Sequence, residues 1–418
     1  MKNSRREFIK LGVASSVASI ASRDVSYGSK HTNDLTEKID KALAQPVLKA
    51  EFFKQPVKIA AVELLKNGKQ YLVRVRSTDG ATGIAIANPD VMISTYPIFL
   101  NRVAPFFVGK DARELESLIE GVYLHNSNYK WQGLPFWACL ASAELAILDL
   151  LGKVAAKPIG ELLGSIVRKE IAVYRASGNR GNSPEAEIEY LRELVAETGA
   201  KAIKFRLGGR MKYNQETTRR DKALIVQTRK VFGDGMTIYA DANGSYDIPM
   251  AIHVGKLMQE YRLAFLEEPC PFDYYDETKQ IADALDIPIA GGEQESSMRR
   301  FRWMIENNAL QIVQPDLIYF GGIIRSIRVA RMAAAAKMDC TPHMSGGGLG
   351  YLYVVLFASC VPNAGPFQEY KGIDKSLPVT SDTSSLKSEN GIIKVPSGPG
   401  LGIKIDPEFI SKAAVVSA

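Results

Sequence analysis

Polar residues recur at nearly equal intervals in the second half of the chain, each at the end of a short apolar segment. Subtracting their positions gives steps of 26, 26, 23, 27 and 26 residues. They are Asp241, Glu267, Glu293, Asp316, His343 and Glu369. One strand, one helix and two loops occupy about this length. Unrelated surface charges would not keep such a period, so the spacing predicts repeated β/α units that each end a strand with a polar side chain.

The chain between these residues has the alternation of a parallel α/β barrel. Short apolar strands and amphipathic helices follow one another after Gly164, and Ser183-Pro184 provides an N-cap and a first-position proline for one helix. The expected strands are 171–176, 202–206, 237–241, 264–267, 288–292, 312–314, one near Cys340 and 366–369. We predict a barrel over 166–375, with the periodic polar side chains at its carboxyl-terminal mouth.

A β-rich module precedes the barrel. Apolar runs 57–65 and 70–76 are joined across Asn67-Gly68, a pair typical of tight hairpins. Leu, Ala and Ile recur at helical spacing over 141–153. We expect a small α+β domain over 56–165, completed by a C-terminal segment over 376–418 that returns to it.

The N-terminus has the pattern of an export signal. Ser4-Arg5-Arg6-Glu7-Phe8-Ile9-Lys10 precedes an apolar stretch, 11–21, that ends in small residues. This order resembles a twin-arginine signal, and the stretch is shorter than the ~20 apolar residues of a spanning helix. We predict a signal peptide over 1–22, a polar tether over 23–55, and export to the periplasm by the twin-arginine machinery. The alternative is a disordered basic tail.

Composition excludes other classes. The 418 residues are 46% hydrophobic and 23% charged with a net charge of +6, which is typical of a globular protein of about two domains. No basic face interleaved with aromatic residues indicates a nucleic-acid partner. The four cysteines form no CxxC pair, which argues against a zinc site or a disulfide framework.

Asp241, Glu267 and Glu293 fall on successive predicted strands without a neighbouring Cys or His. Carboxylate oxygens suit Mg²⁺ and disfavour zinc. Three converging anions also repel one another unless a cation lies between them. The sequence therefore predicts one Mg²⁺ per site.

The chain resembles the enolase superfamily, in the branch that includes mandelate racemase, muconate-cycloisomerising enzymes and acid-sugar dehydratases. The resemblance extends from about Val57 to Ile405 and rests on seven motifs in order. They are Lys204-Phe205-Arg206, Asp241-Ala242-Asn243, Leu266-Glu267-Glu268-Pro269, Gly292-Glu293-Gln294, Gln314-Pro315-Asp316, Pro342-His343 and Gln368-Glu369. It implies a modified (β/α)7β TIM-type barrel with an α+β capping domain, onto which the segment 395–402 returns as a strand.

The resemblance also implies roles for the polar residues. The three acids would hold Mg²⁺, which stabilises the enediolate formed when the proton next to a substrate carboxylate leaves. His343 and Asp316 resemble the family's base dyad, and Glu369 resembles a protonated donor to the enediolate oxygen. Glu268 would point to the opposite strand face as an ion-pair partner.

Arg206 departs from the commonest family pattern, which has a second lysine there. Lysine can be tuned into a base, whereas arginine stays protonated with a pKa above ~12. Racemisation needs a proton acceptor on each side of the α-carbon, so arginine favours elimination with His343 as the base. Lys204 and Arg206 would then bind and neutralise the carboxylate or enediolate.

The first two strands of the capping domain are joined by only about four residues, Lys66 to Lys69. Members of the family that the chain resembles often carry a longer lid loop here, so the resemblance implies a larger or more open pocket, or a lid from a neighbouring subunit. We expect a homo-oligomer. The candidate substrate-binding residues are Asn243, Tyr174, Tyr129 and Trp131.

We predict a carbon–oxygen lyase that dehydrates a sugar acid to a 2-keto-3-deoxy acid. A racemase, epimerase or cycloisomerase would share the first step. A non-catalytic periplasmic sugar-acid binding protein is the alternative from another class.

Overall fold

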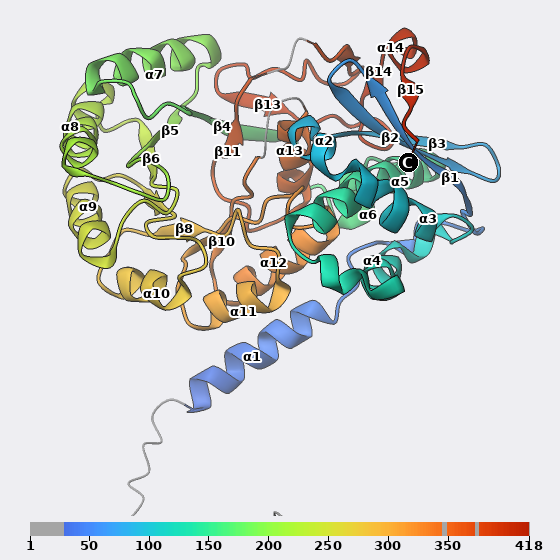
Figure 1. Ribbon diagram of the computed structural model, residues 1–418, viewed down its shortest axis with the longest axis horizontal. Coiled ribbons are helices and arrows are strands. Elements are labelled where there is room, and N and C mark those ends of the chain that lie inside the picture. The colour runs from blue at the N-terminus through green and yellow to red at the C-terminus, as the bar shows by residue number, and fades with distance from the viewer. Residues whose placement is uncertain (1–28, 345–348, 373–375, 418) are drawn as a thin grey trace, which may run out of the picture.

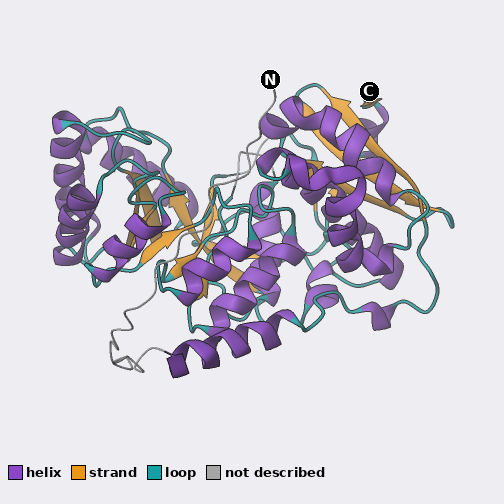
Figure 2. Cartoon of the chain, turned by 60° about the horizontal axis from the view of Figure 1, so that its bottom comes forward, coloured by secondary structure: helices purple, strands orange, loops and turns teal. Residues whose placement is uncertain are grey.

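The computed structural model describes residues 29–344, 349–372 and 376–417. A barrel ringed by helices and a smaller lobe with its own sheet lie beside each other (Figure 1). Helices surround the strands of the barrel, and in the smaller lobe they lie against the sheet (Figure 2). The predicted signal peptide and the first part of the predicted tether lie outside the described residues.

The smaller lobe is an antiparallel sheet packed on helices. The sheet order is β15-β1-β2-β3, from β1 (Ile59–Asn67), β2 (Gln70–Ser77), β3 (Thr82–Ala87) and β15 (Ala414–Val415). Asn67 pairs with Gln70 around Gly68, whose φ is +57°, so the predicted hairpin is confirmed. The helices are α2 (Pro89–Ile98), α3 (Ala104–Phe107), α4 (Leu115–Leu124), α5 (Leu134–Ala155) and α6 (Ile159–Leu163), with short turns η1 (Ala50–Phe52), η2 (Phe99–Val103), η3 (Ala112–Glu114) and η4 (His125–Trp131).

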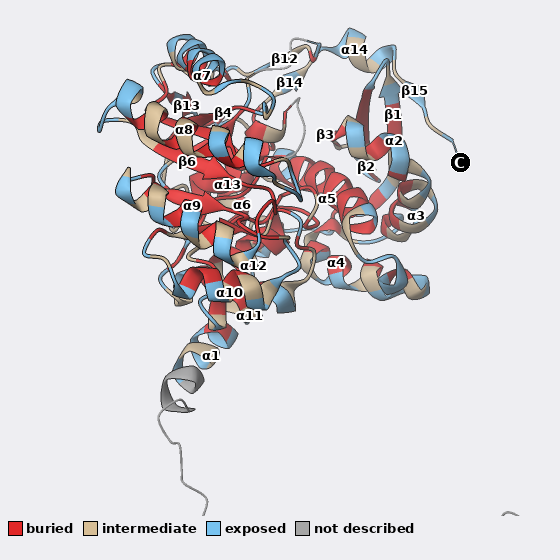
Figure 3. Ribbon diagram, turned by 60° about the vertical axis from the view of Figure 1, so that its left-hand side comes forward, coloured by how far each residue is buried: buried red, intermediate tan, exposed pale blue. Residues whose placement is uncertain are grey.

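Helix α5 is the core of this lobe. It packs against β2 and β3, is buried along most of its length (Figure 3) and ends at the left-handed Ala156. Among the described helices it alone is long and apolar enough to cross a membrane, but 89% of its apolar window is buried inside the protein. Its hydrophobicity is that of a core helix.

The larger lobe contains eight parallel strands among the described residues. Their order is β10-β9-β8-β7-β6-β5-β4-β11. The two ends of this order, β10 and β11, also meet. Cys340 N donates to Asn363 O (2.9 Å) and Gly365 N donates to Cys340 O (3.3 Å), which joins β10 to the segment just before β11. The strands are β4 (Glu170–Ala176), β5 (Ala202–Arg206), β6 (Thr237–Asp241), β7 (Phe265–Glu267), β8 (Ile289–Gly291), β9 (Ile312–Val313), β10 (Asp339–Cys340) and β11 (Gln368–Tyr370). The predicted barrel is confirmed.

Helices cover the outside of the barrel. They are α7 (Pro184–Thr198), α8 (Gln215–Phe232), α9 (Ile248–Glu260), α10 (Tyr275–Asp283), α11 (Met298–Glu306), α12 (Ile323–Ala335) and α13 (Gly350–Cys360). The Ser183 side chain accepts a hydrogen bond from Ala186 N at 3.2 Å, which caps α7 as its sequence indicates. Inside the barrel, Tyr174, Tyr239 and Phe265 pack with alanines and form an apolar layer. This layer closes the barrel interior, as side-chain layers do in such folds.

The C-terminal segment contacts both lobes. Strands β12 (Val379–Thr380) and β14 (Lys404–Ile405) pair with each other in antiparallel fashion, and helix α14 (Pro407–Ser411) follows them. Strand β13 (Ile392–Lys394) pairs with β4 of the barrel, and β15 pairs with β1 of the smaller lobe. The segment 395–402 returns to the capping lobe as expected, but it forms one isolated bridge, between Gly400 and Pro158, and not a strand. That segment is a loop, in which Gly400 O accepts from Ile159 N at 3.0 Å, and the strand that joins the capping sheet is β15.

The predicted polar tether over 23–55 is wrong for its described part. Helix α1 (Ser29–Leu43) runs along the barrel helices α11 and α12, as Figure 1 shows. Ile39 is fully buried, and Arg302 pairs with Asp40 at 2.6 Å. Leu35, Ile39 and Leu43 are spaced by four residues, so they form one apolar stripe within a polar sequence.

Candidate active site

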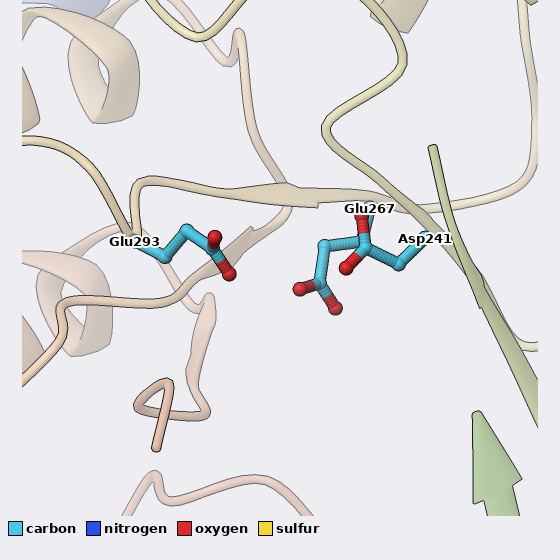
Figure 4. A group of neighbouring side chains, drawn as sticks. All are labelled: Asp241, Glu267 and Glu293. Carbon is cyan, nitrogen blue, oxygen red and sulfur yellow. The ribbon is translucent and has the colours of Figure 1, made fainter. Parts of the chain in front are cut away.

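The three predicted metal acids converge at the mouth of the barrel. Asp241 and Glu267 end β6 and β7, and Glu293 follows β8 by two residues. One ligand atom from each lies within 4.8 Å of the others, and Figure 4 shows their carboxylates directed toward a common space. All three are at least nine-tenths buried. Repeating β/α units place them together because neighbouring parallel strands end at the same rim.

The donor set fits a hard divalent cation. Oδ2 of Asp241 and Oε2 of Glu293 are buried; the first pairs with Arg206, and the second lies 3.2 Å from Nε2 of His343. Three buried carboxylates that converge repel one another, so a cation between them is expected. Their oxygen-only chemistry favours Mg²⁺ over zinc.

Lys204 on β5 lies beneath the acids. Its Nζ donates to Glu267 Oε1 at 2.9 Å and to Oε2 at 2.7 Å, and Gln314 Nε2 donates to the same Oε2 at 3.1 Å. Burial lowers the pKa of Lys204, but the charges of Glu267 and Glu369 outweigh it and raise that pKa overall. Lys204 is therefore a fixed cation under the site.

Arg206, two residues further along β5, is held from several directions. Its Nε donates to Ser177 O at 3.1 Å, its Nη1 donates to Asn243 Oδ1 at 3.3 Å, and it pairs with Asp241. Asn243 N in turn donates to Asp241 Oδ1 at 2.7 Å. These contacts hold the guanidinium beside Asp241 and Asn243.

His343 and Asp316 lie at the ends of neighbouring strands. His343 Nδ1 is 2.6 Å from Asp316 Oδ2, and its Nε2 is 3.2 Å from Glu293 Oε2. Burial lowers the pKa of His343, but Glu293 and the bond to Asp316 outweigh it and raise that pKa to about 9. Because Glu293 is also one of the metal acids, a bound cation would offset the largest of these raising contributions.

Glu369 lies beside two lysine side chains. Its Oε2 accepts from Met344 N at 3.1 Å, and Lys371 Nζ and Lys204 Nζ lie 3.6 Å and 3.9 Å from its Oε1. Burial raises the pKa of Glu369, but these cations outweigh it and hold the pKa well below its usual range. These cations favour the ionised form of Glu369 in the free protein, and its expected role as a protonated donor to the enediolate stays a prediction.

Glu268 departs from expectation. Its φ is +42°, and its side chain lines a cavity at the barrel mouth. The carboxylate accepts a hydrogen bond from Asn243 Nδ2 at 3.3 Å and forms no ion pair in the described part of the chain. The predicted outward ion-pair partner is wrong because β7 ends at Glu267, and the left-handed backbone breaks the alternation of strand side chains. Burial, and next the charges of Glu293 and Glu267, raise the pKa of Glu268 to about 8.

A cavity of about 350 Å³ opens above these groups. Its lining is Arg206, Arg210, Met211, Asn243, Glu268, Phe272, Glu293, Gln294, Tyr319, His343 and Lys371. All of these residues belong to the barrel lobe, so within the described residues the capping lobe contributes none of this lining. The short β1–β2 turn is consistent with a cavity open on that side.

Three predicted pocket walls do not line this cavity. Tyr174 is fully buried inside the barrel, with Lys204 Nζ 5.2 Å from its ring centroid. Tyr129 and Trp131 lie on η4 of the capping lobe, are 43% and 46% exposed, and Trp131 stacks against Arg102. Aromatic residue type alone does not distinguish interior layers and exposed turns from pocket walls. Asn243, the fourth candidate, does line the cavity.

Several residues of the site were not predicted. Lys371 lies two residues after Glu369, so strand alternation could have indicated it. Arg180 contacts Asn243 Oδ1 from the loop after β4, and Arg210 reaches the cavity from the loop after β5. Loop positions carry no periodic signal, so no pattern in the sequence indicates these two arginines.

A capped (β/α) barrel with three acids and a His–Asp dyad at its mouth defines an enzyme of the enolase superfamily. The family descriptions "Mandelate racemase / muconate lactonizing enzyme, N-terminal domain" and "Enolase C-terminal domain-like" match residues 44–164 and 186–409. The chain belongs to the mandelate racemase/muconate lactonizing enzyme family.

Curated relatives narrow the class. The chain is similar to an arabinonate dehydratase of Saccharolobus solfataricus, with 30% identity over 72% of this chain and 78% of the relative. It is also similar to a D-galactonate dehydratase of Klebsiella pneumoniae, with 27% identity over 81% and 89%. The predicted hydro-lyase class is confirmed by these dehydratase relatives.

Solved structures agree on the fold. A proposed racemase from Roseobacter denitrificans superimposes with a TM-score of 0.79 at 32% identity, over 86% of this chain and 99% of that one. A mandelate racemase/muconate lactonizing protein from Paracoccus denitrificans PD1222, solved with magnesium, has a TM-score of 0.77 at 26% identity over the same shares.

Proposed function

We propose that the protein dehydrates a hydroxylated sugar acid to a 2-keto-3-deoxy acid in the presence of Mg²⁺. The single observation that carries the proposal is the pairing of one buried base dyad, His343 and Asp316, with a fixed arginine, Arg206, where two-base enzymes need a second proton acceptor. The names of the arabinonate and D-galactonate dehydratases support a sugar acid as the substrate class.

In the proposed reaction, Nε2 of His343 takes the proton from C2 of the substrate, next to the carboxylate. The bond between C3 and its hydroxyl then breaks, and the hydroxyl leaves as water with a proton returned by the imidazolium. The resulting enol tautomerises to the 2-keto acid. One proton acceptor is sufficient for this sequence.

The other residues of the chain position the substrate and balance charge. Lys204 and Arg206 place two cations beside the acids, where negative charge develops on the substrate carboxylate. Asp316 holds the His343 ring in the orientation that exposes Nε2. Asp241, Glu267 and Glu293 would hold Mg²⁺, which when bound supplies electrostatic stabilisation of that developing charge.

The direct test is incubation of the purified protein in D₂O with Mg²⁺ and a panel of mono- and diacid sugars, followed by an assay for 2-keto acids and by NMR for exchange of the α-proton. We expect keto acid from at least one compound and none with His343→Asn. Product with His343→Asn would remove the base assignment. No keto acid from any compound, with α-proton exchange present, would favour an isomerase; neither signal would favour a binding protein.

We also propose that the protein is exported to the periplasm by the twin-arginine machinery and assembles as a homo-oligomer. Support for export is the order of residues around Arg5 and Arg6. Replacement of both arginines by lysine should leave the protein in the cytoplasmic fraction, and periplasmic protein in that variant would contradict export. Sedimentation of the purified protein at the monomer mass would contradict assembly.

A further inference from the structure

A second and larger cavity lies outside the catalytic mouth. Its volume is about 650 Å³, and its lining shares no residue with the catalytic cavity. Three parts of the chain meet around it: α4 and α5 of the capping lobe, α11 and α12 of the barrel, and the end of α1. Cavities of this size where lobes meet are common positions for small-molecule sites.

Arg325 on α12 is a buried cation in this lining. It is 5% exposed, and its guanidinium lies 3.6 Å from the ring centroid of Trp137. Its Nε donates to Phe320 O at 2.7 Å and its Nη2 to Ser296 O at 2.9 Å, which are neutral acceptors. Within the described residues it forms no ion pair, and no residue there accepts from its Nη1. Burial lowers the pKa of Arg325 to about 10, as expected for a buried cation without a full counter-charge.

The other arginines of the lining differ in their partners. Arg302 pairs with Asp40 on α1, and Arg328 pairs with Glu116 and Glu120 on α4. Arg299 on α11 is exposed and has no ion pair in the part of the chain that the structure describes. Glu120 also lines the cavity, but its ion pair is with Arg328. Arg325 and Arg299 are therefore two cations that face one cavity without an ion pair in the described residues.

The rest of the lining suits an organic molecule. The hydroxyl-bearing Ser296 and Ser297 lie next to Arg299, and Trp137 and Met298 supply apolar surface. The amides of Ser296 and Ser297 already donate to Glu295 Oε1, at 2.7 and 2.6 Å, so the start of α11 is not the source of the positive potential. The arginine side chains carry that charge.

We propose that this cavity is a second binding site, for a small organic anion with a carboxylate or phosphate group. An anionic oxygen would accept from Nη1 of Arg325 and lie near Arg299, while the carbon part contacts Trp137 and Met298. Arginine binds both anionic groups through the same planar donors, so carboxylate and phosphate remain the shared chemistry.

Trp137 provides the readout because Arg325 stacks directly on it. The chain has three tryptophans, so replacement of Trp131 and Trp303 by phenylalanine leaves Trp137 as the only one. The fluorescence of this full-length parent is titrated with inorganic phosphate and, separately, with pyruvate, at an ionic strength kept constant with NaCl. We expect a saturable change with at least one anion, and the arm that responds identifies the anionic group.

Three variants of this parent test where the anion binds. Arg299→Gln should weaken the response about tenfold, the loss of one charge-assisted hydrogen bond, and Arg325→Met should abolish it. Arg210→Gln is the matched control, since Arg210 is an exposed arginine of the catalytic cavity. If Arg325→Met does not fold, Arg299→Gln decides alone.

Absence of a saturable change with both anions would overturn the inference. An unchanged response in Arg299→Gln would also overturn it. Loss of the response in Arg210→Gln would place the anion in the catalytic cavity instead.

Discussion

Asp316 and His343 form a parallel bridge between the ends of two neighbouring barrel strands, with Oδ2 of the aspartate 2.6 Å from Nδ1 of the histidine. The other oxygen, Oδ1, accepts from the amides of Ile318 and Tyr319 at 2.7 and 2.8 Å. The carboxylate is fixed by the backbone, and the ring is fixed by the carboxylate. Nε2 is left facing Glu293 and the cavity.

Asp316→Asn should lower kcat by about 10² to 10⁴, the usual contribution of an oriented acid–base group. The amide cannot support the imidazolium or hold the same tautomer with equal strength. Initial rates of 2-keto acid formation measure the loss. Asp339→Asn, an exposed carboxylate on β10, is the matched control and should retain activity. A rate for Asp316→Asn equal to that of this control would contradict the role of the dyad.

Magnesium should stabilise the fold through the three acids. Mg²⁺ at 100 times its Kd is expected to add about 2.7 kcal/mol to the free energy of unfolding, because it binds only the folded site. Thermal unfolding with and without a chelator measures this gain. It should disappear in Glu293→Gln and persist in Glu260→Gln, an exposed acid on α9. An equal gain in both variants would show that the ion binds at a different site.

Gly322 should tolerate no side chain. Its φ is +110°, and an added Cβ would lie 2.0 Å from Oε2 of Glu144. That carboxylate accepts from Ile323 N through Oε2 at 2.7 Å and from Ile324 N through Oε1 at 2.8 Å. We expect Gly322→Ala to destabilise the protein by about 3 kcal/mol or more, since it combines backbone strain with the loss of this contact.

Gly80→Ala separates these two causes. Gly80 also has a positive φ, +91°, but nothing lies within 4 Å of an added Cβ. Strain alone should cost about 1 kcal/mol there. Equal losses of unfolding free energy at Gly80 and Gly322, measured in urea, would show that the contact with Glu144 contributes nothing.

Glu144 should make stability depend on pH. It is fully buried, and burial raises the pKa of its carboxyl to about 8 despite the two amide bonds. A pKa raised above its unfolded value means that the folded state holds the proton more tightly. The stabilisation is therefore complete below about pH 4.5 and is lost as the pH rises toward 8.

The matching variant is Glu144→Gln, which cannot ionise. The unfolding free energy of the wild type minus that of the variant should fall between pH 5 and pH 8 in urea titrations. A difference that stays constant or increases with pH would show that the carboxyl is ionised throughout, held by the amides of α12.

The periodic strand-end residues predicted the barrel and the meeting of Asp241, Glu267 and Glu293, because parallel strands of similar length end at one rim. Glu268 was misplaced because its direction depends on a left-handed backbone that no sequence period reveals. Helix α1 was missed because Leu35, Ile39 and Leu43 are few among polar residues, and α12, which they contact, is distant in sequence. Arg180 and Arg210 reach the site from loops, where position depends on tertiary contacts.

The most direct test of one-base elimination is a proton NMR time course in D₂O with Mg²⁺ and a sugar acid that the enzyme converts. Because Arg206 cannot accept a proton, we expect the 2-keto-3-deoxy acid to accumulate while the remaining substrate keeps its C2 proton and its configuration. Deuterium at C2 of an epimerised substrate, without keto acid, would contradict the account.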